Sequence, residues 1–297
     1  MLTLIALLLA ISLLPACSVS PEADTENVPS APESAYYAQT EFSAREMIEY
    51  TVSMDICEDE ARADDGTPLA SYRFHLPVLT ALRGDGTAVT EPRTEMEEQA
   101  AEVVKAFNDK FDKWAEAGEF RDLTAGAEED LLWRRAEGLD WSGGYTLELN
   151  CVVYQTEHLI SVSGEYYSNT GGAHPNTYLL GWNFDLDSGT FFAPETLADD
   201  AGFQQAVSEE LCRQAQEKAK VHDIEPEMFF WQDFEHTISD WSSYAVSFDE
   251  TGMTVAFSPY ELAAYAAGPQ KFHLTYDWLL PHLSEHGRMV LGLETAE

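Results

Sequence analysis

Apolar and polar residues alternate in several stretches of the chain, and a period of two is typical of strands that bury one face. In the stretch 178–186, Tyr178, Trp182 and Phe184 are expected to share the buried face. Pro77 is expected to close an earlier strand, because proline removes a ladder hydrogen bond. The strands predicted in this way cover residues 48–56, 72–76, 145–153, 159–167, 178–186, 244–248, 253–257 and 272–274.

Other stretches place apolar residues three and four positions apart, which is the spacing of a helix with one buried face. Gly118 is expected to end the first of these helices, and Asp199 and Asp200 can cap the second. Strands and helices follow one another in blocks, which predicts an α+β fold: a largely antiparallel sheet packed by a long helix in each half. The predicted helices cover about residues 96–114, 203–215 and 275–283, with a short one near 129–136.

The N-terminal residues predict export. Residues 2–16 are almost continuously apolar, too short a run for a comfortable membrane span but suited to the core of a signal peptide. Leu14-Pro-Ala-Cys17 resembles a lipobox, which predicts a signal peptide over residues 1–16 and lipidation of Cys17. Because a proline precedes the small residue and no Lys or Arg precedes the apolar run, a plain signal peptide or short anchor is the alternative. We expect an extracytoplasmic lipoprotein on the bacterial cytoplasmic membrane.

Composition divides the rest of the chain. Residues 17–43 are rich in proline, acidic and small residues, and such a segment buries too little apolar surface to fold, so we expect a disordered tether. The following residues have a globular composition, and residues 286–297 form a tail. Cys57 and Cys151 lie in predicted strands and could form a disulfide if those strands are neighbours. The alternative is that Cys57, Cys151 and Cys212 are all buried thiols.

Acidic residues dominate the charge of the chain. There are 53 Asp and Glu residues against 16 Lys and Arg residues, a formal net charge of −37. We expect neither nucleic acid nor anionic lipid as a partner, because phosphate binding requires clustered Lys and Arg. The acidity either keeps an exported protein soluble or attracts cationic partners in a salt-dependent manner.

Motifs of known enzyme classes are missing from the sequence. The eight histidines show no recognised metal spacing, and there is no nucleophile elbow or phosphate-binding glycine loop. Asp185-Leu-Asp-Ser-Gly189 has part of a calcium loop but lacks the third acidic ligand, so an ordinary turn is favoured. We therefore predict no catalytic residue, metal or cofactor.

The stretch SNTGGAHPNT, residues 168–177, joins two predicted strands and concentrates unusual residues. Gly171 and Gly172 permit backbone angles closed to other residues, and Pro175 stiffens the exit. His174 could lock this corner, contact a ligand or act in catalysis, and the structural corner is favoured. Further along, residues 229–241 hold a cluster of aromatic side chains, for which a place in the core is favoured; the alternative is that part of the cluster is exposed for recognition. The candidate ligand-binding residues are His174, Asn176, Trp231 and Trp241.

Two motifs resemble a known family. Gly171-Gly-Ala-His-Pro-Asn176, followed by Trp182-Asn-Phe-Asp-Leu-Asp-Ser-Gly189, resembles the hallmark of the RsiV-like extracellular domain. A second passage, residues 257–270 with Gly268 near its end, resembles the aromatic loop before the final strand of that family. The earlier part resembles the companion domain at the N-terminus of PdaC-like peptidoglycan deacetylases. The resemblance predicts a PdaC N-terminal-like region over residues 44–170 and an RsiV C-terminal-like region over residues 171–285.

The resemblance implies binding of lysozyme, the role of RsiV-like anti-sigma factors, or attachment to a peptidoglycan deacetylase. The apolar run begins at residue 2, which leaves no cytoplasmic segment for a sigma factor, and few residues follow the last predicted helix. We therefore expect a non-catalytic cell-envelope lipoprotein that binds a cell-wall component or a cationic protein such as lysozyme. The alternative is an accessory protein or enzyme that acts on peptidoglycan through an unrecognised site.

Overall fold

The computed structural model describes residues 47–114, 118–141, 143–199, 202–241 and 244–293, and they belong to one compact unit. The predicted signal peptide, Cys17 and the tether lie outside the described residues. Within the described ranges, no helix is long and apolar enough to cross a membrane.

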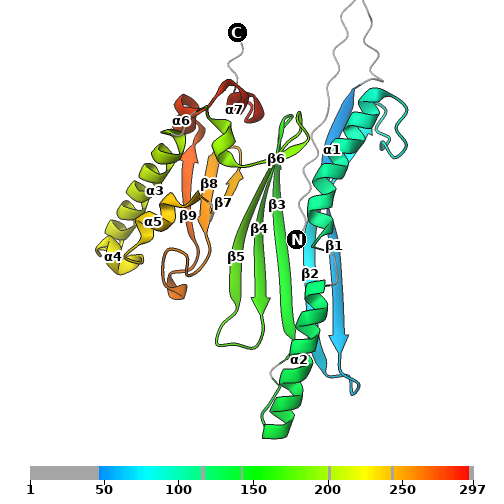
Figure 1. Ribbon diagram of the computed structural model, residues 1–297, viewed down its shortest axis with the longest axis vertical. Coiled ribbons are helices and arrows are strands. Elements are labelled where there is room, and N and C mark those ends of the chain that lie inside the picture. The colour runs from blue at the N-terminus through cyan, green and yellow to red at the C-terminus, as the bar shows by residue number, and fades with distance from the viewer. Residues whose placement is uncertain (1–46, 115–117, 142, 200–201, 242–243, 294–297) are drawn as a thin grey trace, which may run out of the picture. The chain divides into compact units, whose positions relative to one another are not determined.

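A sheet of six strands forms the larger part of the fold, in the order β1-β2-β3-β4-β5-β6 (Figure 1). All neighbouring strands are antiparallel except β2 and β3, which are parallel. The predicted α+β fold with a largely antiparallel sheet is confirmed, and the sheet spans both regions of resemblance. The strands are β1 (Ile48–Arg62), β2 (Pro68–Arg83), β3 (Tyr145–Gln155), β4 (Leu159–Asn169), β5 (Asn176–Asp185) and β6 (Thr190–Phe192).

Two helices connect the parallel strands β2 and β3, since a parallel pair requires a crossover. The first, α1 (Glu95–Asp112), lies on the sheet and buries Phe107 and Phe111, as its spacing predicts. Gly118 does not end α1. It begins α2 (Gly118–Glu137), which is far longer than the short helix expected in this part of the chain. Leu132 and Trp133 of α2 are exposed, so the apolar residues of this helix do not show the three- and four-residue spacing of a single buried face.

Strand β2 continues through Pro77, so the expectation that this proline closes the strand is wrong. The reason is that β3 pairs with β2 only as far as His75, and Pro77 has a strand neighbour on the β1 side alone. Proline is tolerated where a ladder is one-sided. Beyond it, the Asn108 side chain of α1 accepts a hydrogen bond from the Leu79 N–H at 2.8 Å and donates one to the Leu79 carbonyl at 3.0 Å.

The three cysteines that the structure describes are free thiols. Cys57 on β1 lies opposite Phe74 of β2, which in turn lies opposite Leu149 of β3. One strand therefore separates Cys57 from Cys151, and two strand spacings of about 4.8 Å exceed the Cα separation that a disulfide allows. The possible disulfide between Cys57 and Cys151 is therefore wrong. Cys57, Cys151 and Cys212 are all unpaired in the described part of the chain, and of the three only Cys151 is buried.

A second sheet holds three antiparallel strands, β7 (Ala245–Phe248), β8 (Gly252–Phe257) and β9 (Gln270–Thr275). The helix α3 (Gly202–Val221) packs beside it and buries the predicted stripe from Phe203 to Ala215 (Figure 1). The expected closing helix is interrupted after Leu279, where α6 gives way to a 3₁₀ turn that contains Pro281. The remaining elements are η1 (Pro194–Leu197), α4 (Pro226–Phe229), α5 (Phe234–Ser239), η3 (Tyr265–Ala267), α6 (Tyr276–Leu279), η4 (Leu280–His282) and α7 (Glu285–Val290).

The two sheets meet where β5 lies against β7. The Asn183 side chain donates a hydrogen bond to the Val246 carbonyl at 3.0 Å and accepts one from Ser161 at 2.8 Å. The Ser161 hydroxyl also accepts from the Phe248 N–H at 2.7 Å, so the buried polar atoms of this contact are satisfied. Strand β5 is thus covered on both faces along its second half. Tyr178, which was expected on the core face, lies at the open start of β5 and is 49% exposed.

The start of α1 gives a pH-dependent prediction. Arg83 donates two hydrogen bonds to Glu97, at 2.7 and 3.0 Å, and the Arg93 N–H donates a third, at 2.7 Å. The Arg83 bonds are the main cause of a pKa of Glu97 below its usual 4.5. A depressed native pKa contributes stability above the unfolded pKa, and that stability is lost as the pH falls through the native value.

We expect Glu97→Gln to be less stable than the wild type by an amount that is constant above about pH 6 and shrinks below pH 4.5. Urea unfolding at a series of pH values measures this difference. A difference that stays the same down to acid pH would contradict the assignment of the ion pair.

Candidate functional site

The turn between β4 and β5 meets the loop 258–269 between β8 and β9, and their aromatic rings form a cluster. The His174 ring stacks on Tyr265 with centroids 3.9 Å apart, and its Nε2 lies 2.9 Å from the Tyr260 hydroxyl. Its Nδ1 lies 3.1 Å from the Pro175 carbonyl, which can only accept. In the neutral ring Nδ1 therefore donates, and Nε2 accepts from Tyr260. The two motifs that carry the family resemblance thus touch each other.

Tyr260 has an unusual backbone conformation. Its φ is 75°, in the left-handed region that bulky side chains avoid, at a cost of about 1–2 kcal/mol. Trp231 holds it there, because the Trp231 indole donates to the Tyr260 carbonyl at 2.9 Å and the Trp231 N–H donates to the Leu262 carbonyl at 2.8 Å. The Tyr260 side chain is nevertheless 51% exposed. An exposed ring on a strained backbone makes Tyr260 a candidate for a functional position.

We call His174, Trp231, Tyr260 and Tyr265 the aromatic junction. It contains two of the four candidate ligand-binding residues and adds the two tyrosines, which lie in the passage 257–270 singled out for its resemblance. Asn176 lies at the start of β5, exposed, and its side chain makes no hydrogen bond to the described residues. The contacts of Trp241 lie elsewhere, with α3.

The glycines of the two motifs have different roles. Gly171 has a φ of 77°, and a Cβ atom there would lie 3.3 Å from the Tyr145 ring, so this position favours glycine. Gly268 has a φ of 68° and ends the turn η3. Gly172 is less constrained, because a Cβ there would meet only the His174 carbonyl at 3.8 Å. Pro175 is half-buried and supplies the carbonyl that orients His174.

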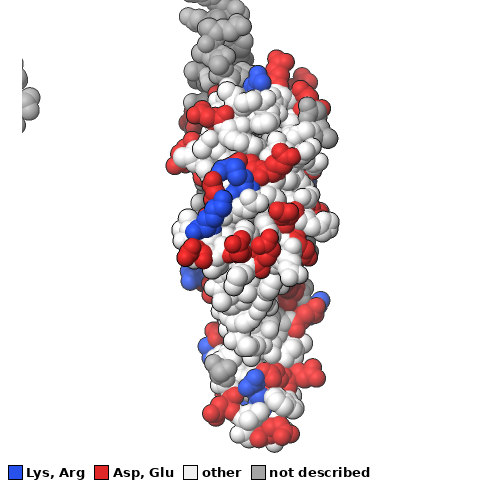
Figure 2. Space-filling model, turned by 90° about the vertical axis from the view of Figure 1, so that its left-hand side faces the viewer, with Lys and Arg blue, Asp and Glu red and all other residues white. Residues whose placement is uncertain are grey.

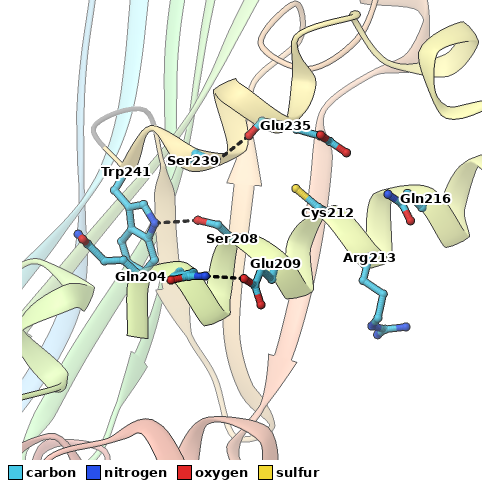
Figure 3. Close-up of a pocket in the computed structure, with 10 residues that line it drawn as sticks. Gln204, Ser208, Glu209, Cys212, Arg213, Gln216, Glu235, Ser239 and Trp241 are labelled. Atoms are coloured by element: carbon cyan, nitrogen blue, oxygen red, sulfur yellow. Dashed lines mark hydrogen bonds between the residues drawn. The ribbon is translucent and has the colours of Figure 1, made fainter. Parts of the chain in front are cut away.

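Trp241 lies at a separate groove of about 680 Å³ between α3 and α5 (Figure 3). Its indole N–H donates to the Ser208 hydroxyl at 3.3 Å, and its ring packs against Phe203 and Tyr244 at 5.9 and 5.1 Å. The groove is lined by Gln204, Gln205, Ser208, Glu209, Cys212, Arg213, Gln216, Glu235, Ser239 and Trp241.

The cation and the thiol of this groove are already engaged or inactive. Arg213 donates to Glu210 at 2.6 and 2.7 Å and to Glu217 at 2.5 Å, which raises the pKa of Arg213 and lowers that of Glu210. Burial, with a smaller effect of nearby carboxylates, raises the pKa of the Cys212 thiol to about 11. The thiol is therefore protonated at neutral pH and is a poor nucleophile.

Acidic side chains are scattered over the face that carries α3, with a small group of basic side chains among them (Figure 2). Below this band the same face is largely uncharged. Among the residues that the structure describes, no three His, Cys, Asp or Glu side chains form a group that could hold a metal ion. Asp185 accepts hydrogen bonds from the N–H groups of Asp187 and Ser188, which is the geometry of a turn.

The comparisons with known proteins give a family for the second part of the chain. Residues 191–277 match the sequence family described as "Protein of unknown function (DUF3298)". This segment is a DUF3298 domain. It begins in β6 and ends in α6, so it contains Trp231, Trp241, Tyr260 and Tyr265 but not His174. No curated protein matches the chain in sequence.

Solved structures of DUF3298 family proteins resemble a longer part of the chain. A member from Bacteroides fragilis superposes with a TM-score of 0.58 at 12% identity, and the match covers 83% of this chain and 98% of the other. A protein from Pseudomonas aeruginosa PAO1 gives a TM-score of 0.49 at 13% identity, over 80% of this chain and 96% of its own. The first likeness shows a shared fold that extends well beyond the DUF3298 domain.

Proposed function

We propose that this protein is a non-catalytic binding protein of the bacterial cell envelope, and that its aromatic junction contacts a cationic protein such as lysozyme. The observation that carries the proposal is Tyr260, an exposed ring in a strained backbone conformation. Two segments far apart in the sequence hold Tyr260 in place. The His174 ring forms a hydrogen bond with its hydroxyl, and the Trp231 indole donates one to its carbonyl. Exposed aromatic residues of this kind are frequent anchors of protein interfaces.

Charge supports a cationic partner. The net charge of −37 attracts a basic protein over a distance and increases the association rate at low salt. At contact, the faces of tyrosine and tryptophan rings attract Lys and Arg side chains of a partner. The lipoprotein anchor expected at Cys17 would hold the protein at the outer face of the membrane, where such a partner arrives.

The test measures binding of the purified full-length chain to hen lysozyme at low and near-physiological salt. We expect saturable binding at both, weaker at the higher salt because charge attraction is screened. Tyr260→Gly and Tyr260→Ala should each lower the affinity about tenfold or more, through loss of the ring. Tyr260→Gly should be about 1 kcal/mol more stable than Tyr260→Ala, because only glycine relieves the left-handed strain.

Trp133→Ala is the matched control, since Trp133 is an exposed aromatic residue on α2 outside the junction. It should leave the affinity unchanged. The proposal is wrong if lysozyme does not bind at either salt, or if it binds Tyr260→Gly as tightly as the wild type. Release of soluble fragments from peptidoglycan by the wild type would support the enzymatic alternative instead.

A further inference from the structure

The groove between α3 and α5 has the features of a second binding site, independent of the aromatic junction. We propose that it binds a neutral oligosaccharide, with Trp241 as a stacking surface and the amides of α3 as hydrogen-bonding partners. The groove shares no residue with the junction and lies wholly within the DUF3298 domain. The inference therefore goes beyond the proposed function.

Trp241 supplies a fixed flat surface at one end of the groove (Figure 3). Contacts with Phe203 and Tyr244 hold the ring, and the hydrogen bond to Ser208 fixes its rotation. The indole N–H is satisfied within the protein, so the ring offers apolar contact rather than a free donor. A half-buried, immobilised indole loses little conformational entropy when the apolar face of a sugar ring stacks on it.

Amide and hydroxyl groups line the floor of the groove along α3. Gln204, Ser208, Cys212 and Gln216 are spaced four residues apart, so they follow one face of the helix over about 18 Å. The side chains of Gln204 and Gln216 make no hydrogen bond to any described residue. Each amide can both donate and accept, which matches the hydroxyl groups of a sugar.

The charges of the groove argue against an anionic ligand. Arg213 is the only cation in the described lining, and Glu210 and Glu217 already bind its guanidinium. Glu209 and Glu235 would repel a phosphate, sulfate or uronate but accept hydrogen bonds from hydroxyl groups. The protonated Cys212 thiol adds no charge. An uncharged ligand with many hydroxyl groups fits this combination best.

The experiment is calorimetric titration of the full-length chain with two neutral probes, chitotetraose and cellotetraose, at millimolar concentration. We expect saturable binding of at least one probe and a change in tryptophan fluorescence. Gln216→Ala, at an exposed position, should weaken binding about fivefold, the effect of one hydrogen bond of about 1 kcal/mol. Trp241→Leu should weaken it tenfold or more.

Gln232→Ala is the matched control, because Gln232 is an exposed glutamine outside the groove. It should bind the probe as the wild type does, and so should Tyr260→Gly, whether or not lysozyme binds. Circular dichroism shows whether Trp241→Leu is folded. If it is not, the affinity of Gln216→Ala for the probe shows whether the sugar binds in the groove. The proposal is overturned if neither probe binds, if Gln216→Ala has no effect, or if oligolysine binds the groove in place of the sugars.

Discussion

Replacement of Gly181 with alanine is expected to destabilise the protein by about 3 kcal/mol, the upper part of the range for overpacking. A Cβ atom at this position would lie 2.2 Å from the Val246 carbonyl oxygen and 2.6 Å from the Val246 nitrogen. Both are backbone atoms of β7, so no side chain can rotate away. The two sheets would have to separate, and the hydrogen bond from Asn183 to the Val246 carbonyl would lengthen or break.

The prediction can be checked by urea unfolding, with Gly172→Ala as the control. Gly172 lies in the β4–β5 turn, where a Cβ has no close neighbour, so its replacement should change the stability by no more than about 0.5 kcal/mol. Equal stability of the two variants would show that β5 and β7 are not in backbone contact.

The same contact connects stability with the candidate site. The hydrogen bond from the Leu179 N–H to the Ser258 hydroxyl, at 3.0 Å, joins β5 to the start of the loop 258–269. This bond fixes the start of the loop that carries Tyr260 to the strand that follows His174. We infer that the junction depends on the packing of the two sheets as much as on its own four residues.

Local periodicity was enough to predict most strands and both buried helical faces. The alternation in β3 and the spacing in α3 reflect burial against one neighbouring layer, and burial of that kind is visible in a short window of sequence. Strands β4 and β5 are the informative exceptions, because the second sheet covers part of their other face. The burial of Leu179 and Asn183 could not be predicted without knowledge of β7.

The errors arose where a distant partner overrides a local signal. Pro77 is tolerated because β2 pairs with β3 only as far as His75, and β3 begins about seventy residues further along the chain. The length of α2 was missed because few of its side chains are buried and the exposed Trp133 breaks the period. The possible disulfide between Cys57 and Cys151 depended on which strands are neighbours, and β2 lies between the strands of these two cysteines.

The candidate site was predicted only in part for the same reason. His174 stood out through its motif, and Trp231 through the density of aromatic residues around it. Tyr260 and Tyr265 lie in the second motif, but nothing in the sequence distinguishes an exposed, strained tyrosine from a buried one. Their importance comes from the approach of two loops separated by more than eighty residues, which only the fold reveals.

Replacement of Phe107 with alanine should have the largest effect, a loss of about 4 kcal/mol of stability. Phe107 is fully buried, and its ring contacts Phe111, Phe184 and Phe191 with centroids 5.1, 5.3 and 5.8 Å away. These partners come from α1, β5 and the adjoining β6, so the Phe107 ring packs α1 against the β5–β6 edge of the six-stranded sheet. Its removal leaves a cavity that the surrounding strands cannot close.

Met96→Ala tests whether the loss is specific, because Met96 lies on the same helix but is 49% exposed. It should change the stability by about 0.5 kcal/mol or less. Phe107→Leu should fall between the two, since it keeps part of the buried volume. A similar urea midpoint for Phe107→Ala and Met96→Ala would contradict the packing of α1 on the six-stranded sheet. A cost near 4 kcal/mol would place Phe107 at the centre of that core, and a loss of that size is a large fraction of the stability of a typical domain.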